Sequence, residues 1–538
     1  IELSDVILVE GANPAWCHPI LWRRIEAHKA ANPEVKIICV DPRKTQTAFS
    51  SDLHIPLIPG TDVFFNNALG RELIENGFTD AAFIKNHADG YEAYKAKVFE
   101  KTTAEYAEIC GIDTQAIKQT ASWIGKSKGF LSMWTMGLNQ SVIGVNKNVS
   151  LINLSLITGK IGRPGNGPFS LTGQPNAMGG REVGGLSNML ASHRELSDPS
   201  HIAEMEDFWG VAGISTKPGL SATEMFEALE SGKLKAIWIV CTNPLVSMPN
   251  ANQIESALKK ARYVVVQDIS KSADTVKFAD VVFPAAGWAE KEGTMTNAER
   301  RISYLNPAKK APGECLPDAE IIWKFAAKMG WGNHFNYKNS SEVYDEYAKS
   351  TIGTNIDCSG INYELLKKGT VQWPYHADKT FETDNKRLFA DKLFYTPNKK
   401  AQILAVGGEN PSEKTTEERP FVLLTGRVRD QWHTRTKTGK VNKLNSHIDN
   451  PYLELNPIDA EKHKVSHESI VVISNKRGQV QVKAKLSDTI REGTCFLPMH
   501  WGKIANSTFG RANNLTSPLV DPISKEPDFK YAAVSVKP

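Results

Sequence analysis

Short hydrophobic runs that end at turn residues recur through the first 300 residues of the chain. The run VILV stops at the turn GANP of residues 11–14, and the HPILWRRIEAHKA stretch that follows has the apolar spacing of a helix. VKIICVDP is typical of a strand ending at Asp41, and a third run, SSDLHIPLIPG, occupies residues 51–60. Strands that alternate with helices in this way predict a parallel sheet with both faces covered.

The same order returns between residues 236 and 288. AIWIV stops at CTNP, NQIESALKKA predicts a helix, YVVVQD ends at Asp268, and FADVVFPAAGW supplies the third run. Both copies have Asn-Pro after the first strand, an aspartate closing the second, and D-x-x-x-P in the third, beginning at Asp52 and at Asp280. Two related units at this separation indicate duplicated β-α-β-α-β halves.

The pattern changes from about residue 420. FVLLTGRV, SIVVISNKRGQVQVKAKL and GTCFLPMHW are strand-like runs with a hairpin at NKRG, which predicts a mostly-β domain, a small barrel. Residues 336–415 carry weak, mixed signals and are interpreted as a connecting region. We therefore expect an α/β fold of two related doubly wound, Rossmann-like parallel-sheet units plus a C-terminal mostly-β barrel. The expected boundaries are 1–205, 206–335, 336–415 and 416–538.

Composition excludes several classes of protein. The chain has 538 residues, is 41% hydrophobic and carries a net charge of only +4, which argues against a protein that coats nucleic acid or a membrane surface. Its apolar runs fall short of the roughly 18–20 residues that span a bilayer. The seven cysteines are odd in number and widely spaced, so neither a disulfide framework nor a metal site is predicted. A reducing, cytoplasmic location is expected.

The ends of the predicted strands are where a ligand is expected. The loop after a first strand can offer backbone N–H groups to phosphate, and an acid after the second can accept from a ribose hydroxyl or a base edge. Alternatively, GANP and CTNP are only tight turns, and Asp41 and Asp268 only cap helices. The match between the two copies favours nucleotide binding. Neither copy has G-x-G-x-x-G, so an NAD site is not indicated.

Residues 173–185, GQPNAMGGREVGG, place five glycines around Arg181 and Glu182. Ordering such a segment is entropically costly, so its backbone is expected to approach something closely. Arginine is always charged and presents a planar donor fork that suits a planar anion. The alternative is that Arg181 pairs locally with Glu182 and the glycines only allow turns.

Six segments together resemble the molybdopterin oxidoreductases of the dimethyl-sulfoxide-reductase superfamily, and within it the bacterial assimilatory nitrate reductases. They are EGANPAWCHPILWRR (10–24), VDPRKTQTA (40–48), TGKIGRPGNGPFSLTGQPNAMGGREVGG (158–185), WAEKEGTMTNAERR (288–301), TGRVRDQWHTRTKTG (425–439) and SPLVDPISKEPDFKYAAV (517–534). The resemblance covers essentially the whole chain. It implies an enzyme that reduces nitrate to nitrite by oxygen-atom transfer. Its implied cofactor is molybdenum bis(molybdopterin guanine dinucleotide). Its implied partners are nitrate and an electron donor, either a reductase subunit, a ferredoxin or a flavodoxin, without nucleic acid or a membrane span.

The resemblance also implies the residues of the site, transferred position by position. Arg181 would contact the substrate anion. The first dinucleotide would take Glu10, Gly11, Ala12, Asn13, Cys17, Val40, Asp41, Arg43, Lys44, Gly60, Thr61 and Asp62. Pterin contacts would come from Met136 and Gln140. The second dinucleotide would take Asn243, Gln267, Asp268, Lys291 and Asp318. The barrel would add Thr425, Gly426, Arg427, Gln431, Trp432, His433, Thr434, Trp501, Asn513 and Lys530.

The chain departs from the family pattern at its start. The family's cysteine-rich segment, which binds a [4Fe-4S] cluster, and its molybdenum-ligating cysteine both precede the strand that begins this sequence. The resemblance therefore implies a cluster only in a full-length form, and this chain is expected to be an incomplete, inactive portion. Cys17 occupies a cofactor-loop position and not the metal-ligand position.

Two other functions stay open. A formate dehydrogenase shares the scaffold, but its loop carries an R-G-Q-N-N-type sequence, whereas the arginine here follows the glycines. The second open function is that of a non-catalytic protein that binds guanine nucleotide or pterin. Among minor candidates, His433 either donates to a cofactor oxygen or is structural. Arg435 and Lys437 are expected on a solvated face. Met178 either lines the substrate funnel that residues 173–185 would form or fills a gap.

Overall fold

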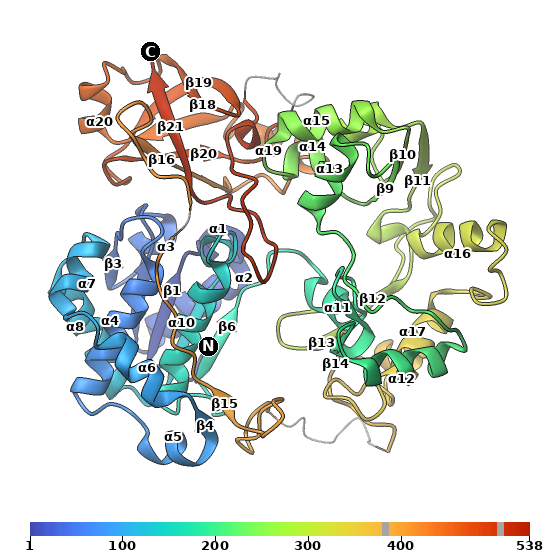
Figure 1. Ribbon diagram of the computed structural model, residues 1–538, viewed down its shortest axis with the longest axis horizontal. Coiled ribbons are helices and arrows are strands. Elements are labelled where there is room, and N and C mark those ends of the chain that lie inside the picture. Colours follow the sequence, from blue (N-terminus) through green and yellow to red (C-terminus); the bar gives the residue numbers. More distant parts are fainter. Residues whose placement is uncertain (379–386, 411, 503–509) are drawn as a thin grey trace. The chain divides into compact units, whose positions relative to one another are not determined.

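The computed structural model describes residues 1–378, 387–410, 412–502 and 510–538, and divides the chain into two compact units (Figure 1). Unit 1 comprises Ile1–Leu171, Pro244–Glu255 and Arg387–Pro538, and unit 2 comprises Thr172–Asn243 and Ser256–Lys386. The four segments expected from the sequence are therefore distributed differently. The chain leaves unit 1 after residue 171, and a short piece around residue 250 returns to it. Each unit is described by itself.

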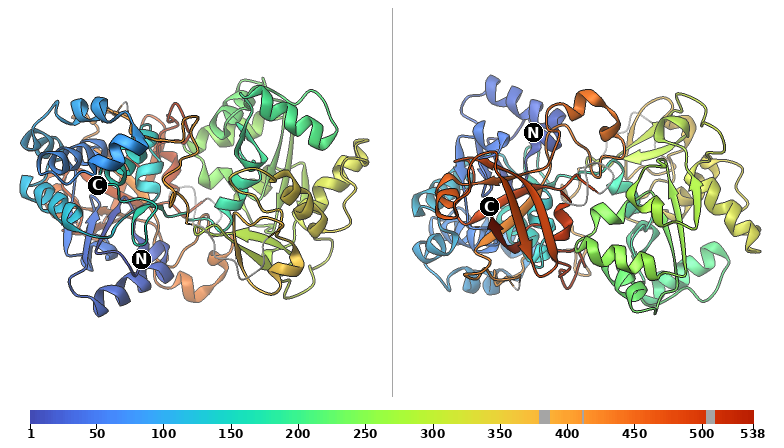
Figure 2. Two further views of the ribbon diagram at one scale, coloured as in Figure 1. Left: turned by 90° about the horizontal axis from the view of Figure 1, so that it is seen from below. Right: turned by 90° about the horizontal axis from the view of Figure 1, so that it is seen from above.

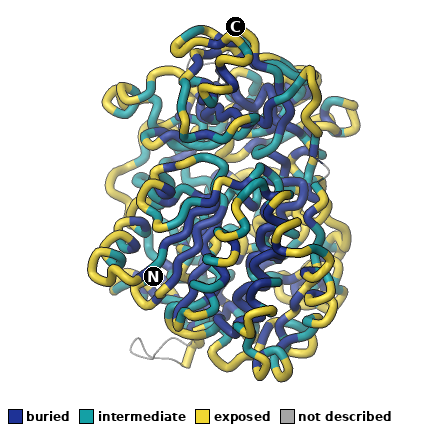
Figure 3. Tube along the Cα trace, turned by 90° about the vertical axis from the view of Figure 1, so that its left-hand side faces the viewer, coloured by how far each residue is buried: buried dark blue, intermediate teal, exposed yellow. Residues whose placement is uncertain are grey.

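Unit 1 contains a five-stranded parallel sheet in the order β3-β2-β1-β5-β6. The strands are β1 (Val6–Glu10), β2 (Lys36–Val40), β3 (Leu53–Ile55), β5 (Phe130–Trp134) and β6 (Gly167–Ser170). Val6–Glu10 lies in register with Lys36–Val40 on one side and Phe130–Trp134 on the other, so three strands end at one edge. All five residues of β1 are buried, as expected of a strand covered on both faces (Figure 3).

The two faces of this sheet belong to two different hydrophobic cores. Val6 and Leu8 pack into the larger one, and Ile7 and Val9 into the smaller one with Ile25 of α2 (Pro19–Ala31), which is the period-2 alternation of a strand. The larger core also contains side chains of α4 (Asp62–Glu75), α8 (Thr114–Lys126) and α10 (Gly144–Ile157). The remaining short elements of this part are α1 (Pro14–Cys17), α3 (Gln46–Phe49), α5 (Ala81–His87), β4 (Ala88–Asp89), α6 (Tyr91–Val98), α7 (Thr103–Cys110), α9 (Met136–Asn139) and β15 (Ala401–Gln402).

The C-terminal part of unit 1 is a closed six-stranded barrel, which confirms the expected β domain. Its strand order is β16-β20-β17-β19-β18-β21, and the right-hand view of Figure 2 shows these strands in orange and red, with the C-terminus on the barrel. The predicted hairpin is β18–β19, with Asn475 opposite Gly478. The barrel elements are β16 (Phe421–Gly426), α19 (Asn442–Asn445), β17 (Tyr452–Leu455), α20 (Pro457–Lys462), β18 (Ile470–Asn475), β19 (Gly478–Leu486), β20 (Thr494–Pro498) and β21 (Ala532–Lys537).

Unit 2 is built on a second parallel sheet in the order β11-β10-β9. Its strands are β9 (Ala236–Val240), β10 (Tyr263–Asp268) and β11 (Val281–Pro284), and a bridge from Ala285 to Leu316 continues the parallel pattern. A small antiparallel sheet joins β12 (Gly293–Thr296), β13 (Arg301–Leu305) and β14 (Val371–Gln372). The helices of this unit are α11 (Ala177–Glu182), α12 (Pro199–Trp209), α13 (Ala222–Glu230), α16 (Asp318–Lys328), α17 (Ser340–Ser350) and α18 (Tyr363–Leu366). The division between units falls inside α15 (Ala251–Lys260), after α14 (Pro244–Ser247).

The segment interpreted as a connecting region helps to build the core of unit 2. Tyr344, Ile356, Tyr363 and Trp373 are all buried there, together with Ile302 of β13. The sequence did not reveal this because these side chains come from short helices and turns rather than from one periodic element. The interpretation as a mere connection was therefore wrong for the part up to residue 378.

The duplication is visible in matched hydrogen bonds within each unit. Asn13 Oδ1 accepts from the backbone N (3.3 Å) and Oγ1 (2.7 Å) of Thr47, and Asn243 Oδ1 accepts from the same two atoms of Thr275 at 3.2 and 2.7 Å. An Asn-Pro turn is thus joined to the segment after the second strand in both copies. This repetition, with the two parallel sheets and the barrel, confirms the predicted fold class.

The third runs repeat as well. Asp52 Oδ2 accepts from Ile37 N at 2.8 Å, and Asp280 Oδ2 accepts from Val264 N at 2.7 Å. Each of these aspartates therefore fixes the start of its third strand beside the second. Among the described residues, none of the helices combines the length and apolar character needed to cross a bilayer. All seven cysteines are free thiols.

Candidate functional site

The carboxyl edge of the first sheet brings two loops together, backbone against backbone. Gly11 follows β1 with φ of +55°, and a Cβ there would lie 2.7 Å from Leu138 and 2.9 Å from Gly137, both in the short helix α9 after β5. Gly137 N donates to Gly11 O at 2.9 Å. In this sheet the strand order reverses between β1 and β5, the position where parallel α/β sheets accept ligands. Only glycine allows this approach.

Asp41 and Asp268 make the same local turn in their two copies. Asp41 Oδ1 accepts from Arg43 N at 2.9 Å, and Asp268 Oδ1 accepts from Ser270 N at 2.8 Å. Burial raises the pKa of Asp41 to about 6, although the Arg43 hydrogen bond and the charges of Arg43 and Lys530 oppose the shift. Neither aspartate caps a helix, because the N-cap of α3 is Thr45 and that of the 3-10 helix Asp274–Phe278 is Ala273. Each aspartate instead closes a local turn with one carboxylate oxygen. This turn leaves the other oxygen for further hydrogen bonds. It does not conflict with ligand binding, because a carboxylate can accept several hydrogen bonds.

Two cations of the barrel stand close to the loops after β1 and β2. Lys530 Nζ donates to Thr425 O at 2.7 Å, and burial lowers its pKa to about 8 against the opposing influence of Cys17 and Asp41. The Arg427 guanidinium lies 4.3 Å from the ring centre of Trp432. Burial raises the pKa of Cys17, and both cations act in the opposite direction. This combination of cations and backbone loops suits a diphosphate.

His500, which sequence reasoning missed, holds the segment 425–434 in place. Its Nε2 accepts from Val428 N at 3.0 Å, so its Nδ1–H donates to His433 O at 2.7 Å. Burial lowers the pKa of His500 to about 3, so the ring is neutral. Burial, Arg427 and Lys437 also lower the pKa of His433, to about 4. The signal was a histidine at the end of a buried strand, in PMHW, but the contact partner was invisible in the sequence.

Several predicted cofactor residues use their side chains to hold unit 1 together. Arg43 is bound by Glu454 at 3.3 and 2.8 Å and lies 3.6 Å from the ring centre of Phe496. Asp62 pairs with Lys147 at 2.8 Å. Any contact of Arg43 or Asp62 with a dinucleotide would therefore involve the backbone more than the side chain.

Others of the predicted set are deeply buried. Trp501 has no exposed surface, and its Nε1 donates to Asp449 O at 3.3 Å. Asn513 Nδ2 donates to Val246 O at 2.6 Å. Glu10 is also wholly buried, with Oε1 accepting from Asn66 at 3.2 Å and Oε2 without a partner. Burial and the nearby Asp62 raise the pKa of Glu10 well above its usual range.

The remaining predicted residues of unit 1 lie in its loops. Ala12 and Val40 are buried, Lys44 is exposed, and Gly60 takes φ of +88° before the start of α4. Thr61 Oγ1 donates to Ile58 O at 2.7 Å. The half-buried residues of the set are Met136, Gln140, Gly426 and Thr434.

Gln431 and Arg435 fold the loop after β16 back on itself. Gln431 Oε1 accepts from Arg435 Nε at 3.2 Å, and the Arg435 guanidinium lies 4.8 Å from the ring centre of Trp501. Arg435 takes φ of +63° and is buried, so its expected place on a solvated face was wrong. The turn carries it inward, whereas Lys437 is exposed as expected.

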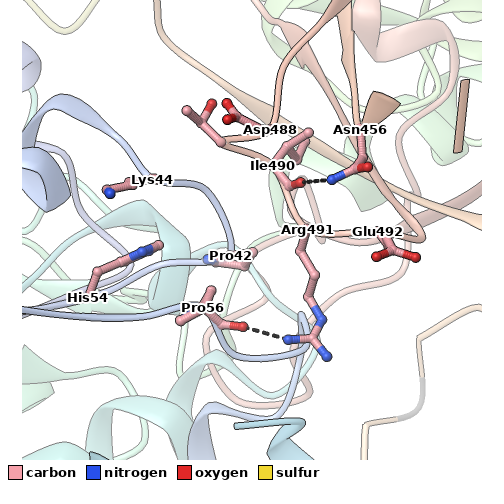
Figure 4. A pocket seen from close by; sticks show the side chains of 10 residues that line it. Pro42, Lys44, His54, Pro56, Asn456, Asp488, Ile490, Arg491 and Glu492 are labelled. Atoms are coloured by element: carbon pink, nitrogen blue, oxygen red, sulfur yellow. Dashed lines mark hydrogen bonds between the residues drawn. The ribbon is translucent and has the colours of Figure 1, made fainter. Parts of the chain in front are cut away.

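A pocket of about 550 Å³ is lined by residues around the ends of β2 and β3 and by residues of the barrel (Figure 4). Lys44 lies on one side of it, and Asp488, Arg491 and Glu492 lie on the other, so the pocket is lined by charges of both signs. Arg491 is bound to Pro56 O and Gly111 O at 2.8 and 2.9 Å, which joins the barrel to the sheet. The other lining residues are Pro42, His54, Asn456, Thr489 and Ile490.

The second copy gathers four side chains at the end of its own sheet. Asp318, the first residue of α16, accepts from Gln267 Nε2 (2.7 Å) and Cys241 Sγ (2.9 Å) at Oδ1, and Lys291 Nζ contacts Oδ2. Burial alone would raise the pKa of Asp318, but these three donors lower it. Gln267 Oε1 is buried without a hydrogen-bond partner. Cys241, which the sequence analysis did not select, joins the predicted Gln267, Lys291 and Asp318.

Arg181 is exposed on the short helix α11, and its neighbour Glu182 anchors that helix. Glu182 Oε1 accepts from Trp373 Nε1 at 2.6 Å, and Oε2 accepts from Thr296 Oγ1 at 2.9 Å. Both carboxylate oxygens are thus engaged by neutral donors, and burial raises the pKa of Glu182. In the described part of the chain no Arg181–Glu182 ion pair is found. Met178 packs against the aromatic core of unit 2, which supports its role as a gap filler.

The residues present fit an anionic guanine dinucleotide at each sheet. The backbone approach at Gly11 and the cations Arg427 and Lys530 suit a diphosphate in unit 1. The orphaned acceptor of Gln267 beside Asp318 and Lys291 suits a ligand edge that carries donors in unit 2.

Two family models match the chain. The one described as "Molybdopterin oxidoreductase" matches residues 1–328, and the one described as "Molydopterin dinucleotide binding domain" matches residues 421–533. The chain is also similar in fold to acetylene hydratase from Pelobacter acetylenicus, with a TM-score of 0.76, 18% identity, and coverage of 99% of this chain and 78% of that one. At this identity the likeness shows the fold alone.

Relatives align along the whole chain. The nitrate reductase of Synechocystis sp. is 40% identical over 100% of this chain and 76% of its own length. The F420-dependent formate dehydrogenase subunit alpha of Methanocaldococcus jannaschii is 36% identical over 100% and 77%. The assimilatory nitrate reductase catalytic subunit of Bacillus subtilis is 33% identical over 100% and 75%. A family match over more than half of the chain, together with these relatives, shows that the chain belongs to the molybdopterin oxidoreductase family, with molybdenum bis(molybdopterin guanine dinucleotide) as its cofactor.

Proposed function

We propose that this molybdenum-dependent oxidoreductase reduces nitrate to nitrite, with Arg181 as the residue that binds the anion. The observation that carries the proposal is the position of Arg181, which is exposed on α11 and forms no ion pair with Glu182 in the described structure. The two carboxylate oxygens of Glu182 accept from Trp373 and Thr296 instead. Relatives named nitrate reductase at 33–40% identity over the full chain support nitrate as the substrate.

The cofactor would supply the two-electron oxygen-atom transfer when bound, and the protein binds and orients. In unit 1, Gly11, Arg427 and Lys530 would hold one dinucleotide at the carboxyl edge of the first sheet. In unit 2, Gln267, Lys291 and Asp318 would hold the other. An electron donor, either a protein or a further domain, would deliver the electrons.

The chemistry required of Arg181 follows from its substrate. Nitrate must leave water to react, and desolvating an anion is costly unless a fixed positive charge meets it. A guanidinium donates two parallel hydrogen bonds to a planar oxyanion, whereas an ammonium acts as a point charge. The anchored Glu182 keeps α11 in place, so the backbone of Arg181 is already positioned when the anion binds.

Formate oxidation is the second candidate. The relative named F420-dependent formate dehydrogenase subunit alpha is 36% identical over the full chain, within the range of the relatives named nitrate reductase. Formate is also a small planar anion, so an arginine would suit it equally well. Assays with both substrates on the same holoenzyme, one with a reduced dye and one with an oxidised dye, separate the two.

We expect Arg181→Lys in the holoenzyme to lower kcat/KM for nitrate by at least about tenfold, a loss near 1.4 kcal/mol in transition-state stabilisation. Steady-state kinetics should be combined with molybdenum and guanine analysis of the same samples. If Arg181 only attracts the anion, KM rises; if it also stabilises charge during bond breaking, kcat falls too.

Arg163→Lys is the matched control, because Arg163 is an exposed arginine outside the 173–185 segment. It should leave kinetics and cofactor content unchanged. Wild-type kinetics in Arg181→Lys would end the assignment of the anion contact. Formate turnover without nitrate turnover in the wild type would replace the proposed substrate.

A further inference from the structure

Cys241 occupies in unit 2 the position that Gly11 occupies in unit 1. Each is the first residue after the first strand of its copy, and each donates its backbone N–H to the second strand, Gly11 to Val40 O at 3.0 Å and Cys241 to Gln267 O at 2.8 Å. Their φ angles are +55° and +56°. The two halves thus share one backbone conformation at this point.

This conformation suits glycine and strains cysteine. A left-handed residue with a Cβ suffers a clash that glycine avoids, and non-glycine residues held there cluster at functional sites. Unit 1 has glycine at this position and avoids the strain, whereas unit 2 has cysteine. We therefore expect an interaction that the Cys241 thiol makes, that glycine could not make, and that would offset the backbone strain.

The thiol makes a contact that explains its presence. Cys241 Sγ donates to Asp318 Oδ1 at 2.9 Å, the same oxygen that accepts from Gln267 Nε2 at 2.7 Å, while Lys291 Nζ contacts Oδ2. Cys241 is exposed overall, but the partial burial of its thiol raises the pKa to about 12, and the Asp318 hydrogen bond acts in the same direction. The sulfur is therefore a protonated donor at neutral pH and a poor nucleophile.

The remaining acceptors of this cluster define what it can bind. An ionised carboxylate offers about four acceptor sites, of which three are used at Asp318. Gln267 Oε1 is wholly buried and has no hydrogen-bond partner. The cluster thus presents acceptors on two neighbouring side chains. A guanine edge, with its ring N–H and exocyclic amino group, donates in two adjacent places.

We propose that Cys241 is a positioning residue whose thiol fixes the carboxylate of Asp318 for a guanine edge. The inference rests on the proposed second dinucleotide site. It explains why a strained cysteine stands where the other copy has glycine. The thiol acts through Asp318 and does not itself need to touch the ligand.

Three substitutions test the role of the thiol by calorimetry with guanosine diphosphate on the purified chain. Cys241→Ser keeps a donor and should bind within about threefold of the wild type. Cys241→Ala loses the donor and should bind about five- to tenfold more weakly at the unit 2 site. All samples also carry Asp41→Ala, which weakens nucleotide binding at the unit 1 site, so that the measured isotherm reports binding at the unit 2 site.

Cys241→Gly separates positioning from structure. Glycine relieves the left-handed strain, so its melting temperature should equal or exceed that of Cys241→Ala, while its affinity falls as far. A merely structural cysteine predicts that affinity follows stability. Nucleotide affinity in Cys241→Ala and Cys241→Gly equal to the wild type would overturn the proposal.

A ligand-free measurement keeps the inference independent of the proposed function. The alkylation rate of Cys241 by iodoacetamide, read by peptide mass spectrometry, should rise severalfold in Asp318→Asn, because the neutral amide no longer disfavours the thiolate. An unchanged rate would refute the thiol–carboxylate contact. If that rate rises but guanosine diphosphate binds neither the wild type nor the variants, the proposed dinucleotide site fails while the contact stands.

Discussion

At the scale of single residues, the barrel segment beside the proposed site is held by one buried, neutral histidine, His500. His500 accepts from Val428 N and donates to His433 O, an arrangement that only the neutral Nδ1–H tautomer satisfies. A charged ring would have to replace the Val428 bond with a repulsive N–H contact. Arg427 and Arg435 also act against a second positive charge there.

This arrangement predicts acid sensitivity. The pKa of His500 is about 3 in the folded protein, below its ordinary value near 6.5, so between these values the unfolded chain binds the proton and the folded chain does not. Stability should therefore fall as the pH decreases from 6.5 toward 3. Each pH unit should cost at most about 1.4 kcal/mol for this group.

The measurement is the slope of the unfolding free energy against pH between 6.5 and 4.5, for the wild type and His500→Gln. Glutamine should reduce the slope by about 1 kcal/mol per pH unit, whatever its effect on stability at pH 7. His433, whose pKa is about 4, should still contribute in the variant. Equal slopes in the two proteins would show that His500 is protonated in the folded state.

At the scale of elements, the two parallel sheets repeat both their strands and the side chains that lock their loops. The Asn-Pro turn after the first strand is tied to Thr47 in unit 1 and to Thr275 in unit 2, with nearly identical distances. The aspartates that begin the third strands repeat in the same way. These locks fix the loops that would receive the dinucleotides.

Removing the hydroxyl of either threonine should loosen one unit only. Thr47→Val and Thr275→Val keep the side-chain shape but leave an asparagine oxygen with one donor fewer, at a cost of about 1–2 kcal/mol. Thr47→Val should cost more, because Ala15 N also donates to Thr47 Oγ1 at 3.2 Å.

Amide hydrogen exchange resolves these effects by unit. Thr47→Val should speed exchange in β1 and β2, and Thr275→Val in β9 and β10. Each variant serves as the control for the other. Equal acceleration in both sheets by either substitution would contradict the view that each lock acts within its own copy.

At the scale of the whole molecule, unit 1 joins a parallel sheet to a barrel that is distant in sequence. Arg43, just after β2, is clamped by Glu454 of β17 and covered by Phe496 of β20. Arg491 extends from the barrel to Pro56 O and Gly111 O. The two parts of unit 1 are thus connected by charged side chains as well as by packing.

Breaking the Arg43–Glu454 pair should destabilise unit 1 strongly. Both side chains are largely buried, at 14% and 6% exposure, so Glu454→Gln leaves a desolvated guanidinium without its counter-ion, at a cost of about 3 kcal/mol. Denaturant unfolding, followed by exchange in the barrel strands, measures the loss. The Arg43→Met/Glu454→Met double variant should recover part of it.

Glu468→Gln is the control for this prediction. Glu468 pairs with Lys483 on the same barrel, but both side chains are more than half exposed, so its loss should leave stability unchanged. If Glu454→Gln behaved like Glu468→Gln, the buried pair would not connect the sheet to the barrel.

The sequence by itself determined the strands, the duplication and the barrel. These features follow from local patterns: apolar runs of strand length, turn residues at their ends and repeated Asn-Pro and D-x-x-x-P signatures. The segment between residues 336 and 378 escaped this reasoning, because its buried aromatic residues, such as Tyr344 and Trp373, belong to no single periodic element. The resemblance, and not periodicity, supplied most of the candidate site.

Tertiary structure alone decided which side chains meet. Cys241 with Asp318, Arg43 with Glu454 and His500 with Val428 are pairs 77, 411 and 72 residues apart. No local pattern encodes such partners, because hydrogen bonds and ion pairs depend on positions that folding brings together across the chain. The strain at Cys241 is visible only in its backbone φ angle, since nothing in the sequence distinguishes a cysteine that follows a strand. Chain-local preferences therefore fixed the elements, and long-range contact fixed the chemistry at their ends.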